Sequence, residues 1–123
     1  MTIFIDNLKL YAHHGVLPQE RLVGAEFLVS VRVDCQTDER ACVHDSLEGT
    51  ISYADLCQEI RQEMAIPSRL LEHAAARIAR HILNTHASAR EVWVRLTKCN
   101  PPMSADCEGA GVEIRLQNDG KMD

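Results

Sequence analysis

The sequence predicts an α+β domain in which two helices lie on one face of a four-stranded antiparallel sheet. Two observations predict it: apolar residues recur at every second position in four short segments, and at helical spacing in two consecutive segments between them. The order is therefore strand, strand, helix, helix, strand, strand. Because the chain has 123 residues and contains no repeat or long linker, we expect one domain over 1–123, with a polar tail from about residue 117.

The first two strands are expected before residue 35. Apolar residues occupy odd positions up to Ile5 and even positions from Leu8 to Ala12, and this change of parity predicts one strand with a bulge. A clean alternation from Phe27 to Asp34 predicts the second strand. The segment between the two strands reads HGVLPQERLVG, and its two glycines and one proline predict a loop.

The spacing of apolar residues becomes helical after Gly49. It predicts one helix over Tyr53–Met64, with Ser52 as the N-cap residue. Pro67 and Ser68 then interrupt the pattern, and a second amphipathic helix is expected from Leu71 to about Thr85.

The last two strands are expected over Val92–Lys98 and Val112–Leu116. An antiparallel sheet of four strands has two open edges and a second face, which here carries Trp93 and Leu28 among polar residues. We therefore expect subunits to join edge to edge into a larger barrel.

Composition and charge limit the classes of partner. The net charge is −5 and no basic run is longer than a pair, which argues against binding to nucleic acid. No apolar run approaches the roughly 20 residues of a membrane span, and the first residues lack the pattern of a leader peptide, so we expect a cytoplasmic protein. The five cysteines include no C-x-x-C pair, which favours reduced thiols over disulfides or a zinc site.

Lys98 breaks the apolar pattern of its strand. Val92, Val94 and Leu96 alternate with polar residues, so position 98 should also carry an apolar side chain. Two interpretations remain open at this point. Either Lys98 points inward, where partial desolvation suits an amine to proton transfer, or its ammonium extends to water at the rim of the sheet.

Glu72 is the second candidate. It falls in the first turn of the second helix, and the neighbours one turn away are Ala75, Ala76 and Ala79, which leave space beside the carboxylate for a ligand. The alternative is that Glu72 only complements the positive end of the helix, or pairs with Arg69.

Glu20 and Tyr53 are weaker candidates when each is taken alone. Glu20 falls in a predicted loop beside Arg21, where a solvated charge is usual, and Tyr53 stands at a helix start. The histidines offer no H-x-H or H-x-x-x-H spacing, so no metal site is expected.

Four segments together resemble a known family. They are HGVLPQER from His14, TISYAD from Thr50, LLEHAAARIA from Leu70 and TKCNPP from Thr97. In this order and spacing they resemble dihydroneopterin aldolase of the folate pathway, and the resemblance extends over about residues 3–116. Cys99 stands where a more polar residue or proline is expected in relatives.

The resemblance implies the tunnelling fold, in which subunits form a tetrameric ring around a barrel, and two rings stack into an octamer. It implies retro-aldol cleavage of 7,8-dihydroneopterin into 6-hydroxymethyl-7,8-dihydropterin and glycolaldehyde, with no metal, no cofactor and no lysine Schiff base. Epimerisation at C2′ is compatible with the same site.

The resemblance also implies roles for the candidate residues in binding. Glu72 would anchor the pterin, because one carboxylate can accept two parallel hydrogen bonds from the 2-amino group and the ring N–H. Backbone groups near Leu71 and Ile51 would complete the recognition.

The remaining implied roles concern proton transfer. Lys98 would be the principal proton carrier. Glu20 would contact the trihydroxypropyl chain or an ordered water, and Tyr53 would reach in from the adjacent subunit to pack near the pterin and relay a proton. Rival readings are an epimerase acting on dihydroneopterin triphosphate, a metal-dependent pterin enzyme of the same superfamily, and a barrel that binds pterins without catalysis.

Overall fold

A computed structural model of the chain describes residues 1–101 and 106–118. It contains one antiparallel sheet with strands in the order β1-β2-β3-β4. The strands are β1 (Thr2–Ala12), β2 (Ala25–Cys35), β3 (Ala89–Cys99) and β4 (Gly109–Gln117). The predicted fold class is confirmed. Most of the polar tail expected from about residue 117 lies outside the described residues.

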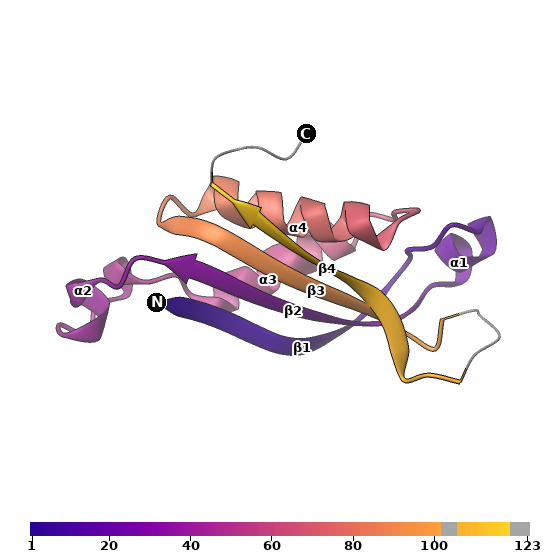
Figure 1. Cartoon of the computed structure of the whole chain (residues 1–123), viewed down its shortest axis with the longest axis horizontal. Helices are drawn as coiled ribbons and strands as arrows, with labels where there is room; N and C mark the ends of the chain where they lie inside the picture. Colours follow the sequence, from indigo (N-terminus) through magenta and orange to yellow (C-terminus); the bar gives the residue numbers. More distant parts are fainter. Residues whose placement is uncertain (102–105, 119–123) are drawn as a thin grey trace.

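Two long helices, α3 (Tyr53–Met64) and α4 (Leu71–Thr85), lie side by side along one face of this sheet (Figure 1). Both begin at the residues predicted from the apolar spacing. Ser52 occupies the N-cap position of α3, but within the described chain its side chain makes no capping hydrogen bond. None of the helices described is long and apolar enough to cross a membrane.

The core lies between the sheet and the two helices. Every apolar residue predicted to face inward on β2 is fully buried, and α3 and α4 contribute their apolar stripes from the other side. These side chains include Phe27, Val29, Val31, Leu56, Ile60, Ile78 and Ile82. The apolar residues at every second position of the strands and those at helical spacing on α3 and α4 therefore line the same interior.

The predicted bulge in β1 is present. The pairing of β1 with β2 shifts between Ile5 and Leu8, and Asn7 has a positive φ of 53°. Ser30 on β2 holds this irregular backbone, because its Oγ accepts a hydrogen bond of 2.8 Å from the Asn7 N–H. The bulge lets β1 place apolar residues on the core side both before and after Asn7.

Three short helical elements lie outside the two-layer core: α1 (Pro18–Val23), α2 (Glu39–Cys42) and a 3₁₀ turn, η1 (Leu47–Gly49). In Figure 1, α1 and α2 are at opposite ends of the sheet.

The loop prediction for 14–24 was wrong for its second half, where α1 forms. Pro18 stands in the first turn, where proline is favoured, and the Glu20 carboxylate accepts a hydrogen bond of 3.0 Å from the Leu17 N–H. Gly24 ends the helix with a φ of 81°.

The sheet has the predicted open edges and second face. Within the described residues, β1 and β4 are the outer strands. On the face away from the helices, the Arg32 guanidinium lies 5.1 Å from the ring centroid of Phe4 and 5.4 Å from that of Trp93. Phe4 remains 52% exposed, so this face retains apolar surface accessible to a neighbour.

We predict that Ser30→Ala lowers the free energy of unfolding by about 1 kcal/mol, because the Asn7 N–H at the bulge loses its acceptor. Urea unfolding followed by circular dichroism measures the change. Ser88→Ala, at an exposed serine, is the control. Equal stability of the Ser30→Ala and wild-type proteins would show that the bulge does not depend on this hydrogen bond.

Candidate functional site

A pocket of about 270 Å³ opens at the end of the sheet where α1 lies. Three parts of the chain that are far apart in the sequence meet there (Figure 1). They are the turn after β1 with α1, the start of α4, and the end of β3 with the adjoining start of β4. The lining residues are Gly15, Val16, Glu20, Arg69, Leu70, Leu71, Glu72, Lys98, Pro101, Ala110, Gly111 and Val112.

Lys98 follows the inward register of β3. It pairs with Phe27 across the sheet and is only 6% exposed, so the interpretation in which its ammonium extends to bulk water is wrong. Its Nζ donates a hydrogen bond of 2.6 Å to Glu20 Oε1 and one of 2.9 Å to the backbone carbonyl of His14. An ammonium has three N–H donors, so these two bonds leave one for a ligand.

Glu20 is not the solvated loop charge that its sequence context favoured. It stands in α1, its side chain is 17% exposed, and its carboxylate bridges Lys98 and the Leu17 N–H. The hydrogen bond from Lys98, followed by that from Leu17, lowers the pKa of Glu20. Glu20 is therefore a carboxylate at neutral pH, and it offsets the charge of the buried ammonium.

Glu72 and Leu71 bring the start of α4 to the same pocket. Glu72 is exposed on the pocket wall, while Ala75 and Ala76 one turn later are buried. No ion pair joins Glu72 to Arg69 in the part of the chain that the structure describes. The first backbone N–H groups of a helix have no partner within the helix, so the start of α4 offers both a carboxylate and backbone donors to a ligand.

Ile51 and Tyr53 do not reach this pocket in the described protomer. Ile51 is part of the core at 5% exposure, and Tyr53 is 71% exposed at the start of α3. This start follows η1, near α2, at the end of the sheet opposite α1 (Figure 1). One chain thus brings together Glu20, Leu71, Glu72 and Lys98 of the predicted residues, and leaves two apart.

Sequence reasoning missed His14, which it considered only as a metal ligand. The imidazole is fully buried, with its ring centroid 5.3 Å from that of Phe27 in an edge-on contact. Its Nδ1 accepts a hydrogen bond of 3.1 Å from the Ser68 N–H. A histidine beside a glycine at the end of a strand carries no signal of such burial, because the contact with Ser68 spans 54 residues.

The His14 imidazole is neutral in the folded protein. Burial, with added repulsion from Arg77, Lys98 and His13, lowers its pKa from 6.5 to about 4. Among the described residues, no group of three or more His, Cys, Asp or Glu side chains is arranged to hold a metal ion.

Comparisons with known proteins point to one family. A family model described as dihydroneopterin aldolase matches residues 3–115. Among curated relatives, the dihydroneopterin aldolase of Staphylococcus epidermidis is 34% identical, with 95% of this chain and 97% of the relative covered. That of Methylorubrum extorquens is 35% identical over 91% of this chain and 86% of the relative.

A solved structure supports the fold independently. The crystal structure of E. coli dihydroneopterin aldolase in complex with neopterin superposes with a TM-score of 0.85, at 20% identity, over 94% of this chain and 98% of that one.

We predict that His14 makes stability depend on pH between about 4 and 6.5. In this window the unfolded chain binds a proton at His14 and the folded chain does not, so the free energy of unfolding falls as the pH falls, by about 3 kcal/mol across the window. His14→Asn removes this dependence, while exposed His44→Asn preserves it. Urea unfolding at several pH values in this window measures it, and parallel losses in wild-type and His14→Asn proteins would contradict it.

Proposed function

The chain belongs to the dihydroneopterin aldolase family, and we propose that it is a folate-pathway enzyme that cleaves 7,8-dihydroneopterin into 6-hydroxymethyl-7,8-dihydropterin and glycolaldehyde. Its four-stranded sheet with helices on one face is the tunnelling fold of this family. The observation that carries the proposal is the ion pair between the buried Lys98 and Glu20, which shares one pocket with the Glu72 carboxylate.

Glu72 is the anchor for the pterin. Its carboxylate is exposed on the pocket wall without an ion-pair partner in the described chain, so both oxygens are free to accept from the 2-amino group and the adjacent ring N–H. Leu71, at the first position of α4, adds a backbone donor beside it. The neopterin held by the E. coli relative supports a pterin as the ligand class.

The reaction needs proton transfer and an electron sink. Cleavage breaks the C1′–C2′ bond: the 2′-hydroxyl loses its proton, C2′ becomes the aldehyde carbon of glycolaldehyde, and the bonding electrons form a C1′=C6 double bond while the π electrons of N5=C6 move onto N5. Protonation of the resulting enamine at C1′ restores the C=N bond and gives the hydroxymethyl product. The substrate supplies its own imine, so the enzyme has no need to form one with a lysine.

Lys98 is the principal proton carrier in this scheme. Its ammonium is largely withdrawn from solvent and keeps one donor beyond those used by Glu20 and His14, which suits it to protonate the enamine. Glu20 contacts the trihydroxypropyl chain or an ordered water. It accepts the proton that leaves the 2′-hydroxyl and passes it to Lys98. One proton is removed and one is delivered, so the pair ends each cycle in its starting state.

Tyr53 and Ile51 complete the site from an adjacent subunit. Tyr53 is exposed at the end of the sheet opposite the chain's own pocket. When subunits join edge to edge, Tyr53 of one subunit enters the pocket of the adjacent subunit. The outer strands β1 and β4 offer the edges for a tetrameric ring, and we propose that two rings stack into an octamer.

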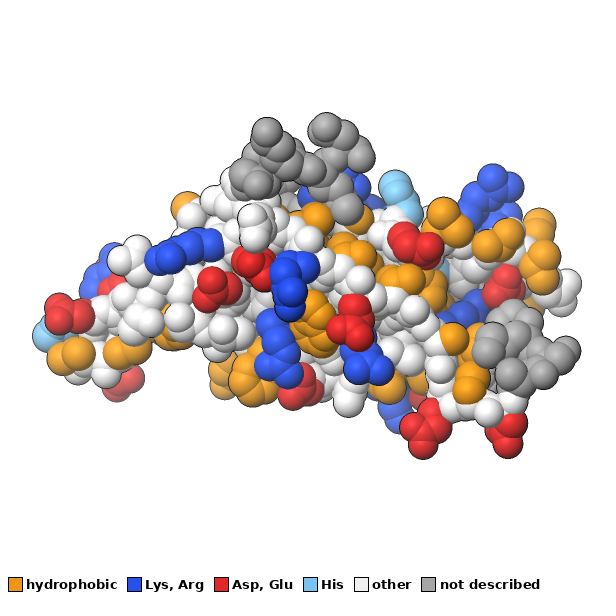
Figure 2. Space-filling view, viewed as in Figure 1, with side chains coloured by type: hydrophobic (Ala, Val, Ile, Leu, Met, Phe, Trp, Pro, Cys, Tyr) orange, Lys and Arg blue, Asp and Glu red, His pale blue; other side chains and the backbone are white. Residues whose placement is uncertain are grey.

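The end of the molecule near α1 also suits an interface. Figure 2 shows apolar side chains gathered there. Val16, Leu17, Leu22 and Val23 are between 56% and 79% exposed in the single chain.

The chain acts as a single domain in a reducing, cytoplasmic compartment, which agrees with the free thiols among its described cysteines.

The charge of the pocket favours the unphosphorylated substrate over dihydroneopterin triphosphate. Glu20 and Glu72 balance Lys98 and Arg69 in the lining, whereas a triphosphate requires an excess of positive charge. Incubation with each substrate, followed by separation of the products, distinguishes the two. Release of glycolaldehyde identifies the aldolase, and inversion at C2′ of the triphosphate identifies the epimerase. If neither product forms, the protein is a pterin-binding module.

We predict that Lys98→Met lowers kcat by about 10²–10⁴-fold while the dissociation constant of the pterin changes little, because the proton carrier is lost and the Glu72 anchor remains. Glycolaldehyde release measures kcat, and pterin fluorescence measures binding. Lys9→Met is the matched control, since Lys9 is an exposed lysine on β1, paired with Glu26 at 3.7 Å. Cleavage at the wild-type rate by the Lys98→Met protein would reject this role.

We also predict that mixed oligomers restore activity. Chains carrying Lys98→Met and chains carrying Tyr53→Phe are each slow alone, but a mixed ring contains some pockets with Lys98 from one subunit and Tyr53 from its neighbour. Refolding the two variants together and comparing turnover with each variant alone measures this. If mixed oligomers form and the activity remains the average of the two variants, Tyr53 does not act across an interface.

A further inference from the structure

His14 lies between the catalytic lysine and the segment that joins the two long helices. Its backbone carbonyl accepts the hydrogen bond of 2.9 Å from Lys98 Nζ. Its side chain points to a different partner, because Nδ1 accepts from the Ser68 N–H at 3.1 Å. The residue therefore connects Lys98 to the chain just before α4 through two separate atoms.

Ser68 is also held to this region through its backbone carbonyl. The Gly15 N–H donates to the Ser68 carbonyl at 2.9 Å, so His14 and Ser68 form a short parallel bridge. Both residues are buried, at 0% and 5% exposure. This bridge places the Lys98 side of the pocket against residues 69–72, which form the pterin-anchoring side.

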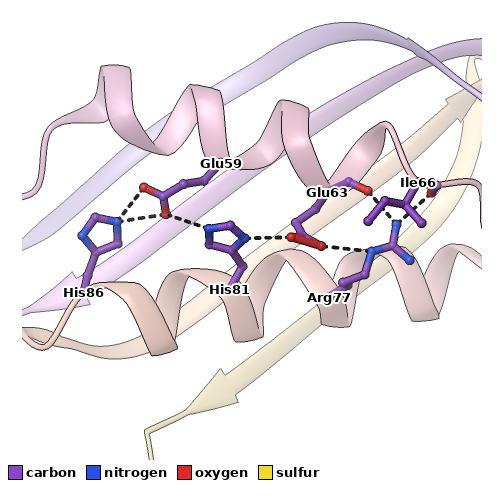
Figure 3. Close-up of polar contacts among 6 residues, drawn as sticks. All are labelled: Glu59, Glu63, Ile66, Arg77, His81 and His86. Atoms are coloured by element: carbon purple, nitrogen blue, oxygen red, sulfur yellow. Dashed lines mark hydrogen bonds and ion pairs between the residues drawn. The ribbon is translucent and has the colours of Figure 1, made fainter.

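Arg77 on α4 holds Ser68 from the other side. One of its terminal nitrogens donates to Ser68 Oγ at 2.8 Å, and the other donates to the carbonyls of Glu63 and Ile66 at 2.6 and 2.9 Å. Figure 3 shows the Arg77 guanidinium between the end of α3 and α4, where its Nε also lies 3.2 Å from Glu63 Oε1. Arg77 therefore links the end of α3, the turn after it and Ser68.

Further contacts between carboxylates of α3 and imidazoles of residues 81 and 86 join the two helices. The Glu63 carboxylate contacts His81 at 2.8 Å, and the Glu59 carboxylate contacts His86 at 2.8 Å (Figure 3). These contacts join α3 to α4, so Arg77 projects from two helices that are linked at several points.

We infer that His14 is a positioning residue for Lys98: its imidazole, bound to the Ser68 backbone that Arg77 secures, holds the His14 carbonyl where it receives the Lys98 ammonium. This inference rests on the role proposed above for Lys98 in cleavage. It adds a group that contacts neither substrate nor product and acts only through the lysine.

Packing alone does not account for an imidazole at this position. With Nδ1 accepting from Ser68, the ring proton is on Nε2, which is buried and has no hydrogen-bond partner among the described residues. An unpaired buried donor is destabilising, and an apolar side chain of similar size would avoid that cost. The acceptor at Nδ1 is what such a side chain would lack.

The neutral state of the ring is consistent with this role. An imidazolium has no lone pair at Nδ1 and could not accept from Ser68. Burial, Arg77 and Lys98 keep the pKa of His14 at about 4, so the acceptor is present at neutral pH.

The test compares two substitutions of His14. His14→Asn keeps an acceptor at the δ position, while His14→Leu removes it and preserves an apolar side chain of comparable size. We expect His14→Asn to keep kcat within about threefold of wild type, and His14→Leu to lower kcat about 10–100-fold with KM for dihydroneopterin within about twofold, because displacement of a reacting group costs rate while the Glu72 anchor remains.

A second measurement reports on Lys98 without turnover. Lys9, Lys98 and Lys121 are the only lysines, so protein labelled with ¹³C at lysine Cε gives three signals. We expect the Lys98 signal to keep its wild-type position in His14→Asn and to move towards that of exposed Lys9 in His14→Leu. If the wild-type protein releases no glycolaldehyde, the proposed function fails, and this spectrum still tests the positioning of the lysine.

Arg77→Gln tests the same chain of contacts from the other end, and it decides the question if His14→Leu does not fold. We expect a lower kcat and a shifted Lys98 signal in Arg77→Gln, and neither change in Arg80→Gln, at an exposed arginine of the same helix. The inference is overturned if His14→Leu retains wild-type kcat and Lys98 signal, if His14→Asn loses as much as His14→Leu, or if a folded Arg77→Gln protein is unchanged in both.

Discussion

The ion pair between Lys98 and Glu20 is the contact around which the end of the sheet is organised. An ammonium that is only 6% exposed requires nearby acceptors, because removing a charge from water is otherwise unfavourable by several kcal/mol. Glu20 and the His14 carbonyl supply them, at 2.6 and 2.9 Å. The turn after β1 and the short helix α1 therefore pack over the end of β3.

The second half of the site depends on the helices. Glu72 stands at the start of α4, and the place of that start is set by the turn that follows α3. The bridge between His14 and Ser68 joins this turn to the Lys98 side, while Arg77 joins it to both helices. Lys98 and Glu72, from distant parts of the chain, are thus brought to one pocket, where we propose that they act as proton carrier and pterin anchor.

The sequence predicted the elements with strong periodicity and missed what depends on long-range contacts. The bulge near Asn7 followed from a change of parity. Alternation along β3 put Lys98 at an inward position but left open whether its ammonium reached water at the rim of the sheet. The segment that contains α1 was taken as a loop because its two glycines and one proline are loop signals, although Pro18 also suits the first turn of a helix. The partner of Lys98 is 78 residues away, which no local pattern encodes.

The roles of the site residues came from the family resemblance rather than from periodicity. Glu20, Glu72 and Lys98 meet in the folded chain, but spacing alone assigned none of them a substrate. Tyr53 could not be placed in the same way, because its expected pocket belongs to another copy of the chain.

The most direct measurement is a crystal structure of this protein with an oxidised pterin that carries the trihydroxypropyl chain, which cannot be cleaved because its ring would have to lose aromaticity. We expect both oxygens of Glu72 to accept from the amino-pyrimidine edge at about 2.7–2.9 Å, and Lys98 Nζ to contact a side-chain hydroxyl. A pterin bound elsewhere, or bound in this pocket with its side chain directed away from Lys98, would contradict the account.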